Sequence, residues 1–150
     1  MDELYEAYFA MLGKFGEFLD RLSELATAKI VAAQRGDVLT VNECMKEEQS
    51  IGLTMRHMDS RREKLSAALG LRDVPLSRMA ERCPPAQRQA ARAAADALLD
   101  KARVFRAASD AARSTIERSL HNVEKRIAAN APGGELAPRK RGGVFTDFRT

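Results

Sequence analysis

Two histidines are the side chains of this chain best suited to metal binding or acid–base catalysis. His57 and His121 lie far apart, and neither has a second His or Cys three or four residues away, although Glu117 and Glu124 flank His121 at i−4 and i+3. This pattern is not one of the recognised metal-ligand spacings, so surface titratable groups are the favoured interpretation. We therefore predict that the protein is not an enzyme and that it holds no metal and no cofactor.

Cys44 and Cys83 are isolated thiols without CxxC spacing, and Cys44 falls on an apolar helical position. Such cysteines behave as small hydrophobic side chains, so both are predicted to be reduced and structural. The Gly pairs at 133–134 and 142–143 lack the preceding strand and following helix of a phosphate-binding loop.

The composition favours long helices over a large globular core. Of the 150 residues, 45% are hydrophobic and 31% charged, Trp is absent, and aromatic residues make up only 5%. The net charge of +4 is mild, and half of it lies in residues 131–150, where four cations stand against two acids. The helices lack a dense basic stripe on one face, which disfavours nucleic-acid binding. No signal-peptide pattern begins the chain and no apolar run is long enough to cross a membrane, so we expect a cytoplasmic protein without membrane insertion.

Three long helices are predicted, over residues 2–35, 38–69 and 85–130. Gly36 and Asp37 suit the end of the first helix and the start of the second, and a short helical connector is expected over 71–84. The fold class is therefore all-α: an elongated antiparallel bundle of three long helices with coiled-coil-like packing, organised around the helix of 85–130. Residues 131–150, rich in Gly and Pro, are expected to form a flexible basic tail.

Each helix carries an apolar seam with alternating spacings of three and four residues. In the second helix Glu48 and Arg62 interrupt this seam, either as side chains that reach water at its edge or as residues that fix register or bind a partner. In the first helix Gly13 and Gly16 suggest the close approach of another backbone. The seam of the third helix consists mostly of small side chains; its residues are Ala91, Ala95, Leu98, Ala102, Phe105, Ser109, Ala112, Ile116, Ser119 and Val123.

The end of the third helix has a wider apolar face, which makes it a candidate surface for a partner helix. The candidate partner-binding residues are Ile116, Leu120, Val123 and Ile127 on the helix and Val144, Phe145 and Phe148 in the tail. The helical residues could equally pack against the first helix. The tail residues could equally dock onto their own bundle or have no function.

The chain also resembles the FlgN-type flagellar export chaperones. The resemblance is carried by an N-terminal helix of about 30 residues, by the stretch VNECMKEEQSIGLTMRHMDSRREKLSAALGL, and by a long helix that ends in SLHNVEKRI. It covers residues 1 to about 127 and includes Glu47 to Gln49, Arg61 or Arg62, Leu69-Gly70, and Ser119, Leu120 and Val123.

The resemblance implies a small cytosolic helical protein in bacterial flagellum biogenesis and type III protein export. It would bind the C-terminal helical segment of hook-associated flagellar proteins, prevent their premature polymerisation, and bring them to components of the export apparatus. The alternative is a structural or scaffolding coiled-coil protein that self-associates, for example as a homodimer, through its apolar stripes.

Overall fold

The computed structural model describes residues 1–130 of the chain. Its elements are α1 (Asp2–Gln34), α2 (Val38–Ala68), a 3-10 turn (Leu76–Arg78), α3 (Met79–Arg82), a second 3-10 turn (Pro85–Gln87) and α4 (Arg88–Asn130). The prediction of an all-helical protein built from long packed helices is confirmed, and residues 1–130 contain no strand. Within the described range there are four α-helices, because part of the connector forms the short helix α3. The predicted tail, residues 131–150, lies outside the described residues.

Short-range chemistry explains the turn between α1 and α2. Gly36 adopts a φ of 72°, the left-handed conformation that glycine tolerates best. Asp37 then caps α2, since its Oδ1 accepts a hydrogen bond from the backbone N–H of Thr40 at 3.1 Å and its Oδ2 one from Thr40 Oγ1 at 2.6 Å. Those hydrogen bonds hold the pKa of Asp37 below its ordinary value. The predicted glycine and cap are therefore confirmed.

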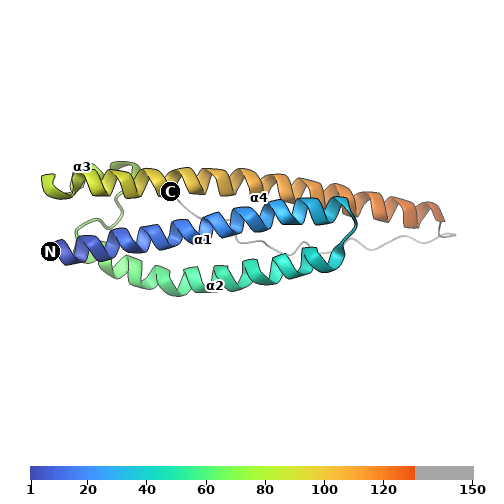
Figure 1. Ribbon diagram of the computed structural model, residues 1–150, viewed down its shortest axis with the longest axis horizontal. Coiled ribbons are helices and arrows are strands. Elements are labelled where there is room, and N and C mark those ends of the chain that lie inside the picture. The colour runs from blue at the N-terminus through green and yellow to red at the C-terminus, as the bar shows by residue number, and fades with distance from the viewer. Residues whose placement is uncertain (131–150) are drawn as a thin grey trace.

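The molecule is a long rod in which α1 is the central helix (Figure 1). α1 packs along both α2 and α4, whereas the backbones of α2 and α4 approach each other at few points. α2 runs antiparallel to α1, and α4 runs in the same direction as α1. The expectation that the helix of 85–130 would be the organising element is therefore wrong. The reason is the width of the apolar face: α1 presents large side chains to two long helices, whereas α4 presents a narrow, Ala-rich stripe to one long helix and to the short connector.

Large buried side chains gather toward one end of the rod. We call this the proximal end; it contains the start of α1, the connector and the start of α4, and the distal end contains the α1–α2 turn and the end of α4 (Figure 1). Phe15, Leu12 and Leu19 of α1 are among the largest fully buried side chains, together with Met79 of α3. The connector therefore covers the proximal core, and it packs mainly on α4.

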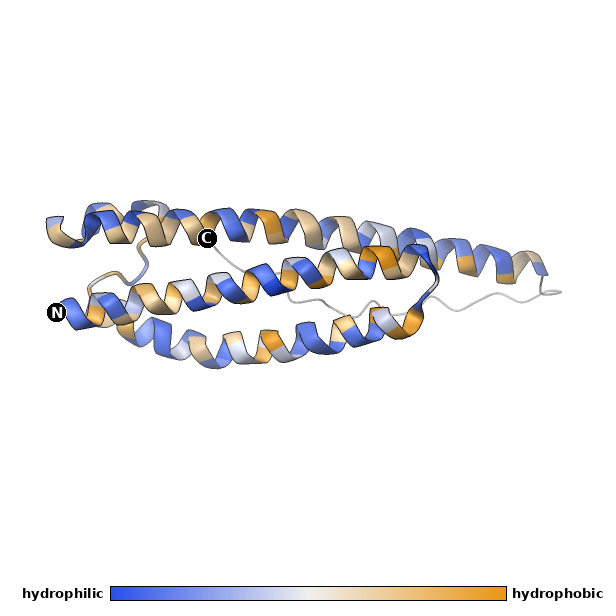
Figure 2. Cartoon of the chain, in the orientation of Figure 1, coloured by the Kyte–Doolittle hydropathy of each residue, from blue (hydrophilic) through white to orange (hydrophobic). Residues whose placement is uncertain are grey.

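Toward the distal end the buried side chains become small or polar, while polar and apolar residues alternate along all three long helices (Figure 2). The aromatic and leucine cluster ends near Leu25 of α1 and Phe105 of α4. Beyond it the buried residues are Ala26, Lys29, Ala32, Cys44, Glu48, Ser109, Ala112 and Thr115. Because small side chains bury little apolar area each, this half of the rod gains less stabilisation from burial.

The two glycines of α1 have different surroundings. A Cβ at Gly16 would lie 3.1 Å from Cδ of Lys101, whereas a Cβ at Gly13 would meet nothing within 4 Å. The expected close approach of a backbone is therefore wrong at both positions. The space beside Gly16 is occupied by the aliphatic part of the Lys101 side chain. The ammonium group of Lys101 lies 2.8 Å from Oδ2 of Asp20.

Candidate partner-binding surface

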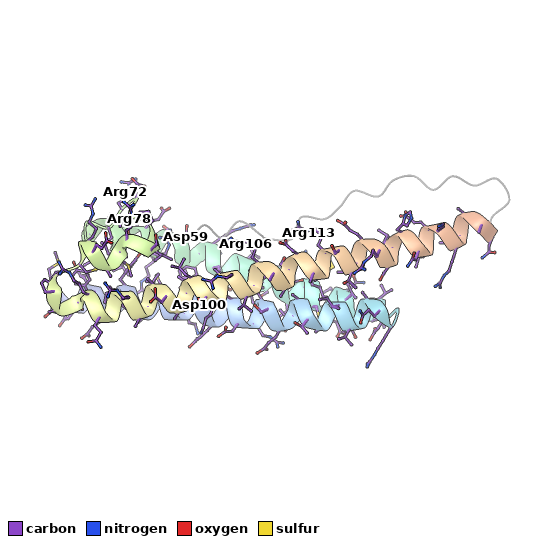
Figure 3. All side chains as sticks on the ribbon, turned by 90° about the horizontal axis from the view of Figure 1, so that it is seen from above. Asp59, Arg72, Arg78, Asp100, Arg106 and Arg113 are labelled. Atoms are coloured by element: carbon purple, nitrogen blue, oxygen red, sulfur yellow. The ribbon has the colours of Figure 1, made fainter. Side chains whose placement is uncertain are left out.

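α4 extends beyond the other helices at the distal end. At the proximal end Gln87 Nε2 donates a hydrogen bond to Asp2 Oδ1 at 3.2 Å, and farther along Lys101 pairs with Asp20. These pairs set an offset of 81 to 85 residues between α1 and α4, which places the last residue of α1 beside residues 115–119. Residues 120–130, which we call the overhang, therefore project past the α1–α2 turn, as Figures 1 and 3 both show. At about 1.5 Å per residue, this segment is about 16 Å long.

The overhang carries three of the four helical residues proposed as a binding stripe. Leu120, Val123 and Ile127 are 37%, 48% and 47% exposed, and Ile116 is half-buried where α1 ends. Ile116 and Val123 continue the seven-residue spacing of the α4 face that packs on α1. The apolar face of α4 is thus longer than the helix that covers it.

The surroundings of this stripe are basic. Residues 111–130 contain four cations, Arg113, Arg118, Lys125 and Arg126, and two acids, Glu117 and Glu124. Figure 3 shows Arg113 on the stretch of α4 that leads into the overhang, with Arg106 two turns before it. The surplus of positive charge favours a ligand with acidic groups beside its apolar face.

A second group of exposed apolar side chains lies at the α1–α2 turn. Val31 is 42% exposed, and Val38 and Leu39 in the first turn of α2 are 66% and 76% exposed. Ten large hydrophobic side chains are exposed within residues 1–130, and the turn and the overhang together hold six of them. Our sequence reasoning missed Val38 and Leu39. A signal was present, since they follow the Asp37 cap but lie outside the apolar seam of the second helix, which begins at Val41 and continues through Cys44 and Ile51.

The two charged residues in the seam of α2 behave differently. Glu48 is only 7% exposed, and its Oε1 lies 2.8 Å from Nζ of Lys29, which is 4% exposed, although the two groups are not aligned as a hydrogen bond. The interpretation that Glu48 reaches water is therefore wrong. Arg62 is half-buried and donates from Nε to Asp59 Oδ1 of its own helix at 2.8 Å.

The residues considered first for chemistry are not brought together. Cys44 and Cys83 are buried and free, and burial raises the pKa of both thiols, which disfavours the reactive thiolate. His57 and His121 are exposed on different helices. No three His, Cys, Asp or Glu side chains among residues 1–130 are grouped so as to hold a metal ion, Glu117, His121 and Glu124 included.

None of the helices in the described range contains a stretch that is both long and apolar enough to cross a membrane. Of the candidate binding residues, Val144, Phe145 and Phe148 lie outside the described residues.

Comparisons with known proteins give no match: no family model, no curated protein and no solved structure is significantly similar to this chain. The resemblance to FlgN-type chaperones therefore remains a hypothesis drawn from the sequence.

Proposed function

We propose that this protein is a cytosolic export chaperone of the FlgN type. It binds the C-terminal helical segment of hook-associated junction proteins, prevents their premature polymerisation, and delivers them to the flagellar export apparatus. The observation that carries the proposal is the apolar face of α4, which continues past the end of α1 and exposes Leu120, Val123 and Ile127.

The shape of this face supports an amphipathic helix as the ligand. An exported subunit that polymerises through helical segments carries an apolar stripe, which must be covered while the subunit waits. Residues one and two turns apart on a helix, as Ile116, Leu120, Val123 and Ile127 are, form a row that packs well against another helix. The overhang spans about three helical turns, enough to contact a partner helix at several positions.

A scaffolding role is the second candidate, and one observation favours it. Six exposed apolar side chains gather at the distal end, and two copies of the chain could bury them by meeting at that end. The two candidates differ in what occupies the surface: another copy in a scaffold, a cargo helix in a chaperone.

Calorimetric titration with a synthetic C-terminal helical segment of a hook-associated junction protein tests the proposal. The variant Leu120→Asp with Val123→Asp should abolish binding, because the bound helix would bury two unpaired carboxylates, and removing them from water costs free energy. Its helical circular dichroism should remain near that of the wild type, since both side chains are exposed and lie outside the core cluster. The matched control is Leu53→Asp with Val104→Asp, which makes the same kind of change at two exposed positions away from the distal end.

The control should bind as the wild type does. Unfolding of the Leu120 and Val123 variant would show that the stripe belongs to the core and would remove the proposed site. Failure of the wild type to bind the segment, combined with a stable oligomer at all concentrations, would favour the scaffold.

A further inference from the structure

The direction of the α4 face indicates where a bound helix would lie. Upstream, this face covers α1, and at Ile116 it reaches the last turn of α1. Val123 continues the same face one heptad later, so it faces the region directly beyond the C-terminal end of α1. A helix bound to the overhang would therefore lie in line with α1, with one end against the α1–α2 turn.

The first turn of α2 faces the same region. Side chains of a helix tilt toward its N-terminus, and the N-terminus of α2 is at the distal end. Val38 and Leu39 therefore lean outward, away from the bundle, and they are two of the most exposed large hydrophobic side chains within residues 1–130. The Asp37 cap and the left-handed Gly36 hold this turn in place.

Charge restricts the ligand further. Two of the four cations of residues 111–130, Lys125 and Arg126, lie on the overhang, and Arg113 and Arg118 precede it on α4. At the turn, the exposed cation Arg35 is offset by the exposed carboxylate of Asp37. A helix with acidic residues beside its apolar stripe would meet complementary charge along its length, at Lys125 and Arg126 of the overhang.

We infer that the first turn of α2 forms the second half of the partner-binding surface. The ligand is an amphipathic helix of about three turns with acidic flanks. Its side packs on Leu120, Val123 and Ile127, and one end rests on Val38 and Leu39. This inference rests on the proposed function and adds the position and length of the bound helix.

The test compares the wild type with Val38→Asp plus Leu39→Asp in calorimetric titration of the same hook-associated segment. Asp in the first turn of a helix is favoured by the helix dipole, so this variant should fold as the wild type does. We expect it to bind at least about tenfold more weakly, a loss of about 1.4 kcal/mol of binding free energy. An uncharged variant, Val38→Ser with Leu39→Ser, separates lost apolar contact from charge repulsion and should also weaken binding.

The outcomes separate this inference from the proposed function. Loss of binding in the Leu120 and Val123 variant, with unchanged binding in both turn variants, would overturn the inference and leave the chaperone proposal standing. Absence of binding by the wild type would overturn both. A wild-type dimer that the turn variants convert to monomer in sedimentation would identify a second copy as the occupant and would also overturn the inference.

Discussion

The Lys29–Glu48 pair is the residue-level feature that most distinguishes the distal half of the rod. Both side chains are almost fully buried. Their ion pair joins α1 to α2 in the distal half of the rod, where the buried side chains are mostly small or polar. Removing two charges from water costs several kcal/mol, and their mutual attraction compensates for this only in part. A buried pair of this kind contributes little net stability, but it disfavours any register of α1 against α2 that separates the two charges.

Lys29→Met should lower the free energy of unfolding by about 3 to 5 kcal/mol, because Glu48 would remain buried without its partner. The double variant Lys29→Met with Glu48→Leu should recover most of this loss, since no buried charge would remain. Urea unfolding measured by circular dichroism gives both values. A loss below about 1 kcal/mol in the single variant would contradict this account, because it would match a solvent-exposed ion pair.

Among the elements, α1 and α4 form the main interface, and small residues allow them to lie close along their length. On α4 these are the alanines of the seam, whereas on α1 Gly16 leaves room for the side chain of Lys101 to reach Asp20. Gly13 sits one turn earlier with open space around it. The missing side chain of Gly16 therefore makes room for Lys101, whereas that of Gly13 makes room for no neighbour.

Gly13→Ala should raise the free energy of unfolding by about 1 kcal/mol, the usual difference between Gly and Ala inside a helix. Gly16→Ala should gain less, or lose stability, because its Cβ would push Lys101 away from its present position. Thermal or urea unfolding of the two single variants compares them directly. Equal gains at both positions would show that Lys101 moves aside at no cost.

At the scale of the whole molecule, residues 1–130 form a rod whose two ends differ in how they are packed. The proximal end contains the aromatic cluster and the connector that covers it. The distal end contains small or polar buried side chains, the overhang and six exposed apolar side chains. Regions with few buried apolar contacts open locally at lower free energy, and binding surfaces are often found there. The large buried side chains and the proposed binding surface thus lie at opposite ends of the rod.

Amide hydrogen exchange should report this difference along α4. In the free protein, amides of residues 120–130 should exchange fast, while those around Leu98 and Phe105 should be strongly protected by the packed core. Adding the hook-associated segment should slow exchange in the overhang by at least about tenfold if the helix binds there. Slow exchange in the overhang of the free protein at all concentrations would contradict this arrangement.

Much of the helix pattern follows from local chemistry and could be predicted. Gly36 and Asp37 separate α1 from α2 through a left-handed residue and a side-chain cap, both of which depend on neighbours in sequence. The period of the apolar residues likewise identifies the α4 face that ends in Ile116, Leu120, Val123 and Ile127. These features require no knowledge of which helix packs on which.

The remaining features depend on contacts between residues far apart in sequence. The offset between α1 and α4 is set by pairs such as Asp20 with Lys101, and that offset decides that Leu120 and Val123 lie beyond α1 instead of beneath it. The partner of Glu48 is nineteen residues away on α1, at a position where the seam pattern predicts an apolar side chain. Periodicity reveals which face of a helix is apolar, but the position of each helix along its neighbour determines which part of that face is covered.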